Sequence, residues 1–406
     1  MNHGQVYVWE QEPASVSGGR IRKAVVPLPR VTGCLRGPTS LSGEYVTVTN
    51  AGWVRSPDAG TASPLGPATP DAGGHFIFEP GRGGGRMDKT TTPDRDFCWR
   101  YVQAARFGEV NTYYHVDLIA EYVDDLLMEI GAASLPRVTA VVNAHHSVAE
   151  INGRRDGVAH GDHWVAFQGG HYRLPGPAIG INEDALVSPD GEIHLGPGRG
   201  LTEHGALAET AGGRYRMNAS HNAGIIYHEY GHHITRHTAD LRANRLRPCN
   251  DQDNRKTALD EGTCDYWTAV MLGSPHIWSW HRRHDESEVH PRSLTSTRTM
   301  ADYKRGPTAD VHENGTIWAA ALWRLREAAA DQELYGGRNI DRLVIKALLI
   351  IGEMTVTGDV NAVAVRRARR GFGAGMVALK RADTLLYGKR YACLIDCALA
   401  KSGIHI

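Results

Sequence analysis

Three successive patterns along the chain predict an α+β fold, in which a mixed sheet-and-helix lobe is followed by a mainly helical C-terminal lobe. Residues 1–95 hold short runs of β-branched and aromatic residues between Pro-, Gly- and Ala-rich stretches, which is typical of a β-rich segment. Residues 96–250 combine long helical periodicity with short strands, whereas residues 251–406 are helical almost throughout. We therefore expect three regions with these boundaries, and a functional site in the cleft between the second and the third.

The N-terminal segment contains four strand candidates. Each is a short run rich in residues that favour strands, and together they cover residues 5–9, 24–26, 44–49 and 75–78. The stretch 56–74, rich in Pro, Gly and Ala, separates the third candidate from the fourth. The glycines at 81–85 open no helical pattern, so they indicate a connector and not a phosphate-binding loop.

Helical patterns dominate from residue 96 onwards. Apolar positions between Phe97 and Leu126 suit one or two long helices. Three short strand candidates follow, at residues 137–143, 164–168 and 192–195. Beyond them the pattern predicts further helices, over residues 257–272, 318–330, 340–351 and 361–386.

The composition narrows the class of protein. A chain of 406 residues exceeds the usual size of a single core, and 41% hydrophobic with 22% charged residues is ordinary for a globular protein. The formal net charge of zero gives no electrostatic case for a nucleic acid or an anionic membrane as partner. No uninterrupted apolar run reaches about 18 residues, so we expect no membrane span. The oligomeric state stays open.

The pentad His-Glu-Tyr-Gly-His at residues 228–232 is the strongest signal in the chain. Side chains at i and i+4 of a helix stand one above the other, so His228 and His232 can offer imidazole nitrogens to one metal ion. Glu229 lies beside the first histidine, from where its carboxylate can reach a water on the ion without becoming a ligand. The pentad therefore predicts one catalytic Zn²⁺ ion, with Glu229 as the general base.

A catalytic zinc ion needs a third protein ligand and an open position. The helical pattern over 257–272 contains Glu261, and Asp265 lies four residues later on the same face. This spacing suggests Glu261 as the third ligand, and Asp265 as the acceptor that holds a zinc-bound histidine in one tautomer. Asp260 is the rival ligand, although it lacks an acidic partner four residues on. Cys264 is expected to be a small buried residue and not a ligand.

These motifs resemble a known family. His-Glu-x-x-His followed by a Glu-x-x-x-Asp helix resembles the thermolysin-like gluzincins, and His-Glu-Tyr-x-His with Glu-Gly-x-x-Asp is most similar to the fungalysins. The resemblance runs from about residue 96 to the end of the chain, while residues 1–50 resemble the junction between a prodomain and the mature unit. It implies a zinc metallopeptidase that acts on protein or peptide substrates. It also implies secretion, but the first residues show no signal-peptide pattern, so the localisation stays open.

The segment around His312 resembles the Val-His-x-x-Gly-x-x-Trp start of a helix in fungalysins. In that family the histidine donates a hydrogen bond to the developing oxyanion, so the resemblance implies this role for His312, oriented by Asp310. Glu313 and Asn314 replace the small or apolar residues that are usual there. The alternative for His312 is a helix-capping residue. Tyr303 is a second candidate donor whose position no motif defines.

The same resemblance suggests where a peptide binds, because gluzincins bind substrate as an added strand on an exposed sheet edge. Residues 191–196 alternate polar and apolar and are similar to the strand that precedes the zinc helix in the family. We therefore expect this strand to be the edge, with Ile193 and Leu195 contacting the substrate. The alternative is an edge strand without a ligand.

Two functions of different classes fit these patterns. The first is a zinc-dependent endopeptidase that hydrolyses peptide bonds with a metal-activated water. The second is a catalytically idle relative that keeps zinc as a fold clamp or binds a partner peptide. Glu229 favours the first, because an idle site has no need of a base beside both ligands. An exopeptidase is a further alternative, although no motif indicates an anchor for a terminal amine or carboxylate.

Overall fold

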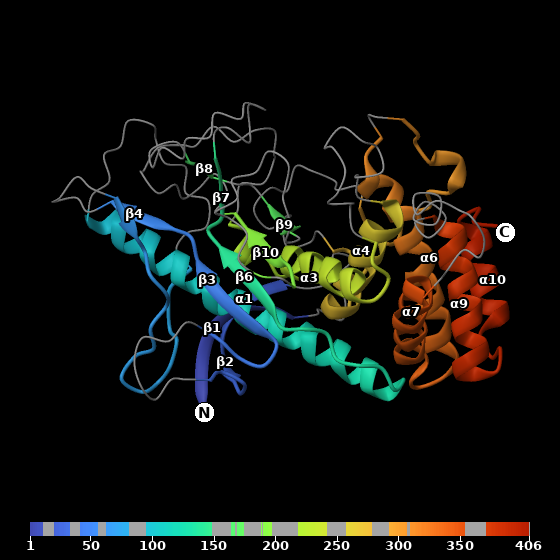
Figure 1. The fold of residues 1–406 in the computed structure, drawn as a ribbon, viewed down its shortest axis with the longest axis horizontal. Coiled ribbons are helices and arrows are strands. Elements are labelled where there is room, and N and C mark those ends of the chain that lie inside the picture. The colour runs from blue at the N-terminus through green and yellow to red at the C-terminus, as the bar shows by residue number, and fades with distance from the viewer. Residues whose placement is uncertain are drawn as a thin grey trace.

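The fold is α+β, as predicted: the described strands lie in the first half of the chain, and the described elements of the last part are helices (Figure 1). The computed structural model describes residues 1–10, 20–32, 41–55, 62–80, 95–147, 164–166, 169–173, 188, 190–196, 218–241, 257–277, 292–306, 309–353 and 371–405. Within these ranges, no helix is both long and apolar enough to cross a membrane.

A four-stranded sheet forms the centre of the first half. Its strand order is β3 (Val46–Asn50), β6 (Val138–Val142), β10 (Glu192–Leu195) and β9 (Gly170–Arg173); the first three are parallel, and β9 is antiparallel to β10. Successive side chains of a strand point to opposite sides, so alternate positions share one face. The buried apolar positions of that face are Val46, Val48, Val138, Ala140, Val142, Ile193 and Leu195.

The N-terminal segment is divided between this sheet and a separate hairpin. β1 (Asn2–Glu10) and β2 (Arg20–Leu28) pair antiparallel along their whole length, while β3 joins the central sheet. Residues 75–78, predicted to be a strand, make only an isolated bridge between Phe76 and Gly4. The reason is visible in the hydrogen bonds, because the Gln5 side chain donates to Phe78 O (2.7 Å) where a strand would pair main chain with main chain. Two short pairs complete the strands, β4 (Trp53–Arg55) with β5 (Ala62–Pro64) and β7 (His145–Ser147) with β8 (Trp164–Ala166).

One continuous helix, α1 (Arg95–Glu129), accounts for the long apolar periodicity after residue 96. It packs on β1, β3 and β6 and on the helix that carries the pentad, and Figure 1 shows it running along the molecule beside the strands. Its buried side follows the 3.6-residue period, as expected for a helix laid against a sheet. The apolar residues of α1 with no exposed surface are Phe107, Val110, Tyr113, Val116, Ile119, Val123, Leu126 and Leu127.

The remaining helices form the C-terminal part of the molecule. α3 (Ala223–His237) packs on α4 (Ala258–Leu272), which packs on α6 (Val311–Gln332), and the short turns η2 (Ala219–His221) and η4 (Met300–Asp302) flank them. α7 (Gly336–Glu353), α9 (Phe372–Tyr387) and α10 (Ala392–Lys401) gather beside α6 at the opposite end from β4 (Figure 1). The predicted helix over 361–386 is confirmed from residue 372, and residues 361–370 lie outside the described ranges.

The prediction that residues 191–196 form an exposed edge is wrong. β10 pairs with β6 on one side and with β9 on the other, so it is an interior strand. Ile193 and Leu195, expected to contact substrate, are fully buried in the apolar face of the sheet. Alternation of polar and apolar residues shows that the two faces of a strand have different surroundings. It does not show whether the strand lies at the edge or in the interior of the sheet. Among the described residues, β9 is the end strand on this side.

Candidate metal centre

Helix α3 places the two histidines of the pentad on one face. The Asn222 side chain caps the helix by accepting a hydrogen bond from the Ile225 main-chain N–H (3.3 Å), which satisfies a donor that has no partner inside the helix. The rings of His228 and His232 lie with centroids 5.1 Å apart, and both residues are less than a tenth exposed. One turn of helix therefore presents two buried imidazoles toward the same neighbour, α4.

Helix α4 brings a carboxylate to both imidazoles. Thr257 caps its first turn by accepting from the Asp260 N–H (3.2 Å), and the buried Glu261 follows one residue later. Glu261 Oε2 lies 3.0 Å from His228 Nε2, and Glu261 Oε1 lies 3.6 Å from His232 Nε2. The carboxylate thus meets the two rings with different oxygens.

The other nitrogen of each ring also faces a carboxylate of α4. His228 Nδ1 lies 2.9 Å from Asp265 Oδ1, and His232 Nδ1 lies 3.2 Å from Asp260 Oδ1. Asp265 therefore stands where it was predicted, beside a pentad histidine. Asp260, weighed as a rival ligand, faces the Nδ1 side of His232 and also accepts from Thr235 Oγ1 (2.6 Å). A carboxylate on Nδ1 holds the proton there and leaves Nε2 as the acceptor that a metal ion needs.

Arg292 completes the surroundings of Asp265 and had no counterpart among the predicted residues. Its Nε donates to Asp265 Oδ2 (3.1 Å) and its Nη2 to Oδ1 (2.5 Å), so the guanidinium meets both oxygens of the carboxylate. Burial would raise the pKa of Asp265, but Arg292 and His228 outweigh it and hold the pKa below the ordinary value. Burial likewise lowers the pKa of His228, whereas hydrogen bonds to Asp265 and Glu261 raise it to about 9. The ring sits in a strongly negative setting that suits a cation.

Glycines explain how the three helices come so close. A Cβ on Gly231 would lie 2.8 Å from Cys264 Cα, and one on Gly262 would lie 2.3 Å from Gly315 O. Real Cβ atoms do not approach backbone this closely, so any larger residue would push α3 from α4 or α4 from α6. The glycine inside the pentad and the glycine after Glu261 are therefore packing residues that set the distance between the helices carrying the donors.

Cys264 is fully buried between the acidic residues of α4, which confirms the prediction of burial. Its Sγ lies 3.3 Å from His232 Nδ1, and its thiol donates to Asp260 Oδ1 (3.7 Å). Burial, followed by the nearby carboxylates Asp260 and Glu261, raises the pKa of the thiol well above its ordinary value. In the metal-free protein Cys264 is thus a neutral thiol in contact with a pentad histidine.

His312 reaches the same centre from the first turn of α6. Its Nε2 lies 3.2 Å from Glu261 Oε2, and its ring centroid lies 6.4 Å from that of His228. Asp310 caps the helix by accepting from the His312 N–H (2.8 Å) and also lies 2.9 Å from His312 Nδ1. The hydrogen bond with His312 is the largest cause that lowers the pKa of Asp310 to about 2. Both the predicted donor and its predicted orienting residue therefore lie at the centre.

Glu229 lies between the pentad helix and strand β9. The residue is 4% exposed, and among the described residues none donates a hydrogen bond to its Oε2. A Cβ built on Gly170 of β9 would lie 2.7 Å from Glu229 Cγ and 2.9 Å from Oε1, so the strand backbone packs directly on this side chain. A buried carboxylate oxygen without a donor is costly unless a ligand, water or proton satisfies it.

The donor atoms fit a zinc ion. Within the described ranges, two groups offer ligand atoms that all lie within 4.8 Å of one another: His228 with Glu261 and His312, and His228 with His232 and Cys264. Imidazole nitrogen, carboxylate oxygen and thiolate sulfur are the donors that zinc takes in proteins. The predicted set His228, His232 and Glu261 draws on both groups, because Glu261 uses one oxygen for each histidine.

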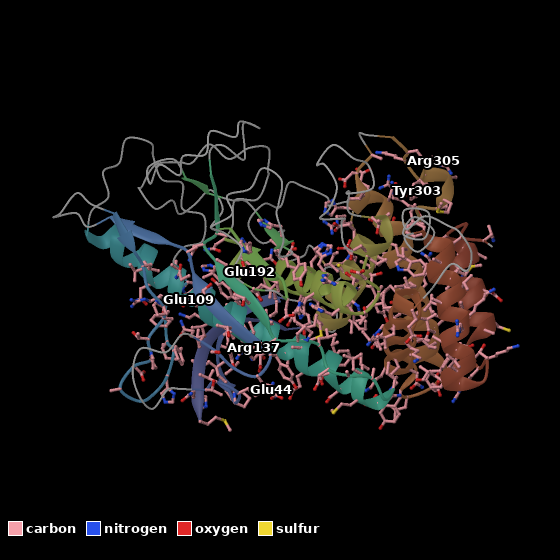
Figure 2. All side chains as sticks on the ribbon, viewed as in Figure 1. Glu44, Glu109, Arg137, Glu192, Tyr303 and Arg305 are labelled. Atoms are coloured by element: carbon pink, nitrogen blue, oxygen red, sulfur yellow. The ribbon has the colours of Figure 1, made fainter. Side chains whose placement is uncertain are left out.

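Tyr303, the other candidate donor, belongs to an aromatic cluster. Its ring meets that of Phe372 edge to face with centroids 5.9 Å apart, and Phe372 stacks on Trp318 at 5.7 Å. Figure 2 shows Tyr303 and Arg305 at the helical end of the molecule, far from Glu192 of the central sheet. The described contacts of Tyr303 are those of a packing residue.

Helices that bring buried imidazoles and carboxylates together, next to an unsatisfied buried glutamate, are features of a metal-dependent hydrolase with an α+β fold. The family described as fungalysin metallopeptidase (M36) matches residues 5–406, essentially the whole chain, so the protein belongs to the fungalysin metallopeptidases. Comparison with curated proteins gave no match. The family implies zinc metallopeptidase activity and a peptide or protein substrate, and it extends the resemblance noted from residue 96 into the N-terminal segment.

Proposed function

We propose that the protein is a zinc-dependent endopeptidase in which His228, His232 and Glu261 hold the ion. One observation carries the proposal: both Nε2 atoms face Glu261, while both Nδ1 atoms are occupied by carboxylates of the same helix. This arrangement selects the tautomer in which Nε2 is the metal-binding nitrogen. Three protein ligands leave a position for water or substrate, as catalytic zinc sites do.

Glu229 is the proposed general base. A zinc ion held by these residues would supply Lewis acidity to the peptide carbonyl and would lower the pKa of a water molecule. Glu229 takes a proton from the attacking water and passes it to the amine that leaves. Its buried Oε2, which accepts from none of the described residues, has the vacant acceptor that this role requires.

His312 is the proposed donor to the oxyanion. Its Nδ1 lies 2.9 Å from Asp310 Oδ1, so Nδ1 carries a proton toward that carboxylate. Its Nε2 points toward the centre, where it lies 3.2 Å from Glu261 Oε2. A ring that also carries a proton on Nε2 can therefore donate a hydrogen bond to the negative oxygen that forms in the transition state. This bond is stronger to the negative oxygen than to the neutral carbonyl of the ground state, so it lowers the barrier.

Strand β9 is the proposed docking edge for the peptide, in place of the interior strand β10. It is the end strand of the described sheet on the side of the pentad helix, and its Gly170 backbone touches Glu229. An extended peptide that adds to such an edge gains main-chain hydrogen bonds along its length. An edge of this kind accepts an internal stretch of chain, which is why we propose endopeptidase specificity.

The test uses zinc-loaded protein and denatured casein, with and without 1,10-phenanthroline, beside Glu229→Gln. We expect cleavage that the chelator abolishes, and a loss of about 10²- to 10⁴-fold in the variant while its zinc content is unchanged. Glu109→Gln is the matched control, because Glu109 is an equally buried carboxylate on α1 that accepts from Asn50 and Ala68. Full zinc occupancy without cleavage would instead support the idle relative, and near-normal activity of Glu229→Gln would overturn its role.

A further inference from the structure

Cys264 adds a soft donor to a centre whose other donors are nitrogen and oxygen. The thiol lies on α4 between Glu261 and Asp265, and it is fully buried against the pentad helix. Its contacts point inward, to His232 Nδ1 at 3.3 Å and to Asp260 Oδ1 at 3.7 Å. A small side chain such as serine occupies nearly the same position, so packing alone does not require sulfur here.

The spacing of these donors suits an ion. In a tetrahedral site with sulfur and nitrogen ligands at their usual bond lengths, neighbouring donor atoms lie about 3.3–3.6 Å apart. The Cys264 sulfur and His232 Nδ1 are 3.3 Å apart, so a cation bound through this nitrogen would replace its contact with Asp260 Oδ1 (3.2 Å). His228 completes a group whose donor atoms all lie within 4.8 Å of one another. Two imidazoles and one thiolate are a ligand set of the soft kind.

This set shares a residue with the proposed catalytic ligands. His228 belongs both to the group with Glu261 and His312 and to the group with His232 and Cys264. One of its nitrogens, Nδ1, already faces Asp265 at 2.9 Å, so the two groups compete for the other. An ion that binds the Cys264 sulfur is therefore not coordinated by Glu261 and does not lie at the group that contains His312.

We propose that His228, His232 and Cys264 form an alternative binding site for a thiophilic divalent cation such as Cd²⁺, and that its occupation excludes catalytic zinc and inhibits the peptidase. The inference rests on the proposed function, because it takes the two histidines as metal ligands. Binding breaks the S–H bond of Cys264 and forms a sulfur–metal bond; the proton leaves to the buffer and no electrons are exchanged. Hard ions such as Mg²⁺ and Ca²⁺ gain nothing from the thiolate and do not bind this way.

The experiment titrates Cd²⁺ into the full-length protein and records the ultraviolet thiolate-to-cadmium charge-transfer band, with ¹¹³Cd NMR as a second readout of sulfur ligation. The background replaces the other five cysteines of the chain with serine, at Cys34, Cys98, Cys249, Cys393 and Cys397, so that Cys264 is the one thiol left. We expect a saturable band that Mg²⁺ does not produce, and loss of the band in Cys264→Ser. Cd²⁺ should also inhibit Cys264→Ser at concentrations at least about tenfold higher than in its parent.

Two results would overturn the inference: a ¹¹³Cd shift that shows only nitrogen and oxygen ligands, or a band of unchanged size in Cys264→Ser. The NMR measurement needs no variant, so it decides the matter even if Cys264→Ser folds poorly. Zinc content and casein cleavage of the same background are measured in parallel. Protein that binds zinc and cleaves casein but shows no Cys264-dependent band refutes the cadmium site alone, whereas protein that binds no zinc refutes the proposed function.

Discussion

Two faces of helix α3 carry histidine pairs in opposite electrical surroundings. On the face toward α4, each Nδ1 of His228 and His232 lies within 3.2 Å of a carboxylate. Hydrogen bonds to carboxylates outweigh burial there and raise the pKa of His228 to about 9. This face attracts a positive charge although it is buried.

On the opposite face, the described hydrogen-bond partners of the two histidines are neutral groups. His233 lies 2.9 Å from Pro136 O and 3.0 Å from the Tyr172 hydroxyl, and His237 lies 2.9 Å from Asp190 O. Burial lowers the pKa of His233 to about 3, with a further contribution from nearby His237. His228 and His233, two buried histidines five residues apart in sequence, therefore differ in charge preference because of their partners and not because of their depth.

The largest expected effect is the loss of zinc binding and of peptidase activity when a histidine on the α4 side of α3 is removed. His228→Ala removes a proposed ligand and should abolish both stoichiometric zinc binding and casein cleavage, because two remaining ligands hold zinc poorly. His237→Ala on the other face should keep both properties. Elemental analysis after dialysis and the casein assay provide the measurements, and zinc retained by His228→Ala would show that the ion lies elsewhere.

A smaller effect is expected when the carboxylate behind the ligand is neutralised. Asp265→Asn keeps the shape but loses the charge that orients His228 and pairs with Arg292, so zinc affinity should fall by about 10- to 100-fold. Competition with a chromophoric chelator measures the affinity. Asp260→Asn should behave similarly through His232; an unchanged dissociation constant in both variants would contradict the role given to this ring of carboxylates.

Gly170→Ala tests the contact between β9 and Glu229, the proposed general base. The added methyl group would lie 2.7 Å from Glu229 Cγ, so either the strand or the side chain must move. We expect kcat to fall by about tenfold at unchanged zinc content, since small misplacements of catalytic groups are costly. Gly373→Ala on α9 is the control, because a Cβ there meets no atom within 4 Å. In a protein that already carries Glu229→Gln, Gly170→Ala should cause little further loss of kcat.

The smallest effect concerns stability at the face of α3 that carries His233 and His237. The pKa of His233 is about 3 in the folded protein and 6.5 in the unfolded chain, so below pH 6.5 only the unfolded chain takes up this proton. The stability linked to His233 is therefore present above pH 6.5 and falls, by about 1.4 kcal/mol per pH unit, as the pH drops toward 3. His233→Gln can still donate to Pro136 O and should remove this slope. Urea unfolding of zinc-free protein compares the two; equal slopes would contradict the prediction.

Most residues of the candidate metal centre could be predicted because their grouping depends on spacing within helices. His228, Glu229 and His232 share one turn of α3, and Glu261 and Asp265 share one turn of α4, so local periodicity places each set. His312 was accessible only through the motif that it shares with the fungalysins.

The remaining parts depend on contacts between distant segments. Arg292 reaches Asp265 from outside any described helix, and no local pattern marks such a residue. Asp260 was weighed as a ligand because sequence does not show which turn of α4 meets the Nδ1 side of His232. The edge was assigned to β10 in place of β9 because strand order follows from pairing across the sheet, which alternation along one strand does not encode.

The glycines between α3, α4 and α6 have a consequence for anyone who redesigns this protein. At Gly262 and Gly315 the two backbones touch with no side chain between them, and Gly231 rests on Cys264 in the same way. Helices α3, α4 and α6 therefore form one rigid unit, because no flexible side chain lies between them to absorb a change. New substrate specificity is best sought at the positions of β9 other than Gly170, whose backbone packs on Glu229.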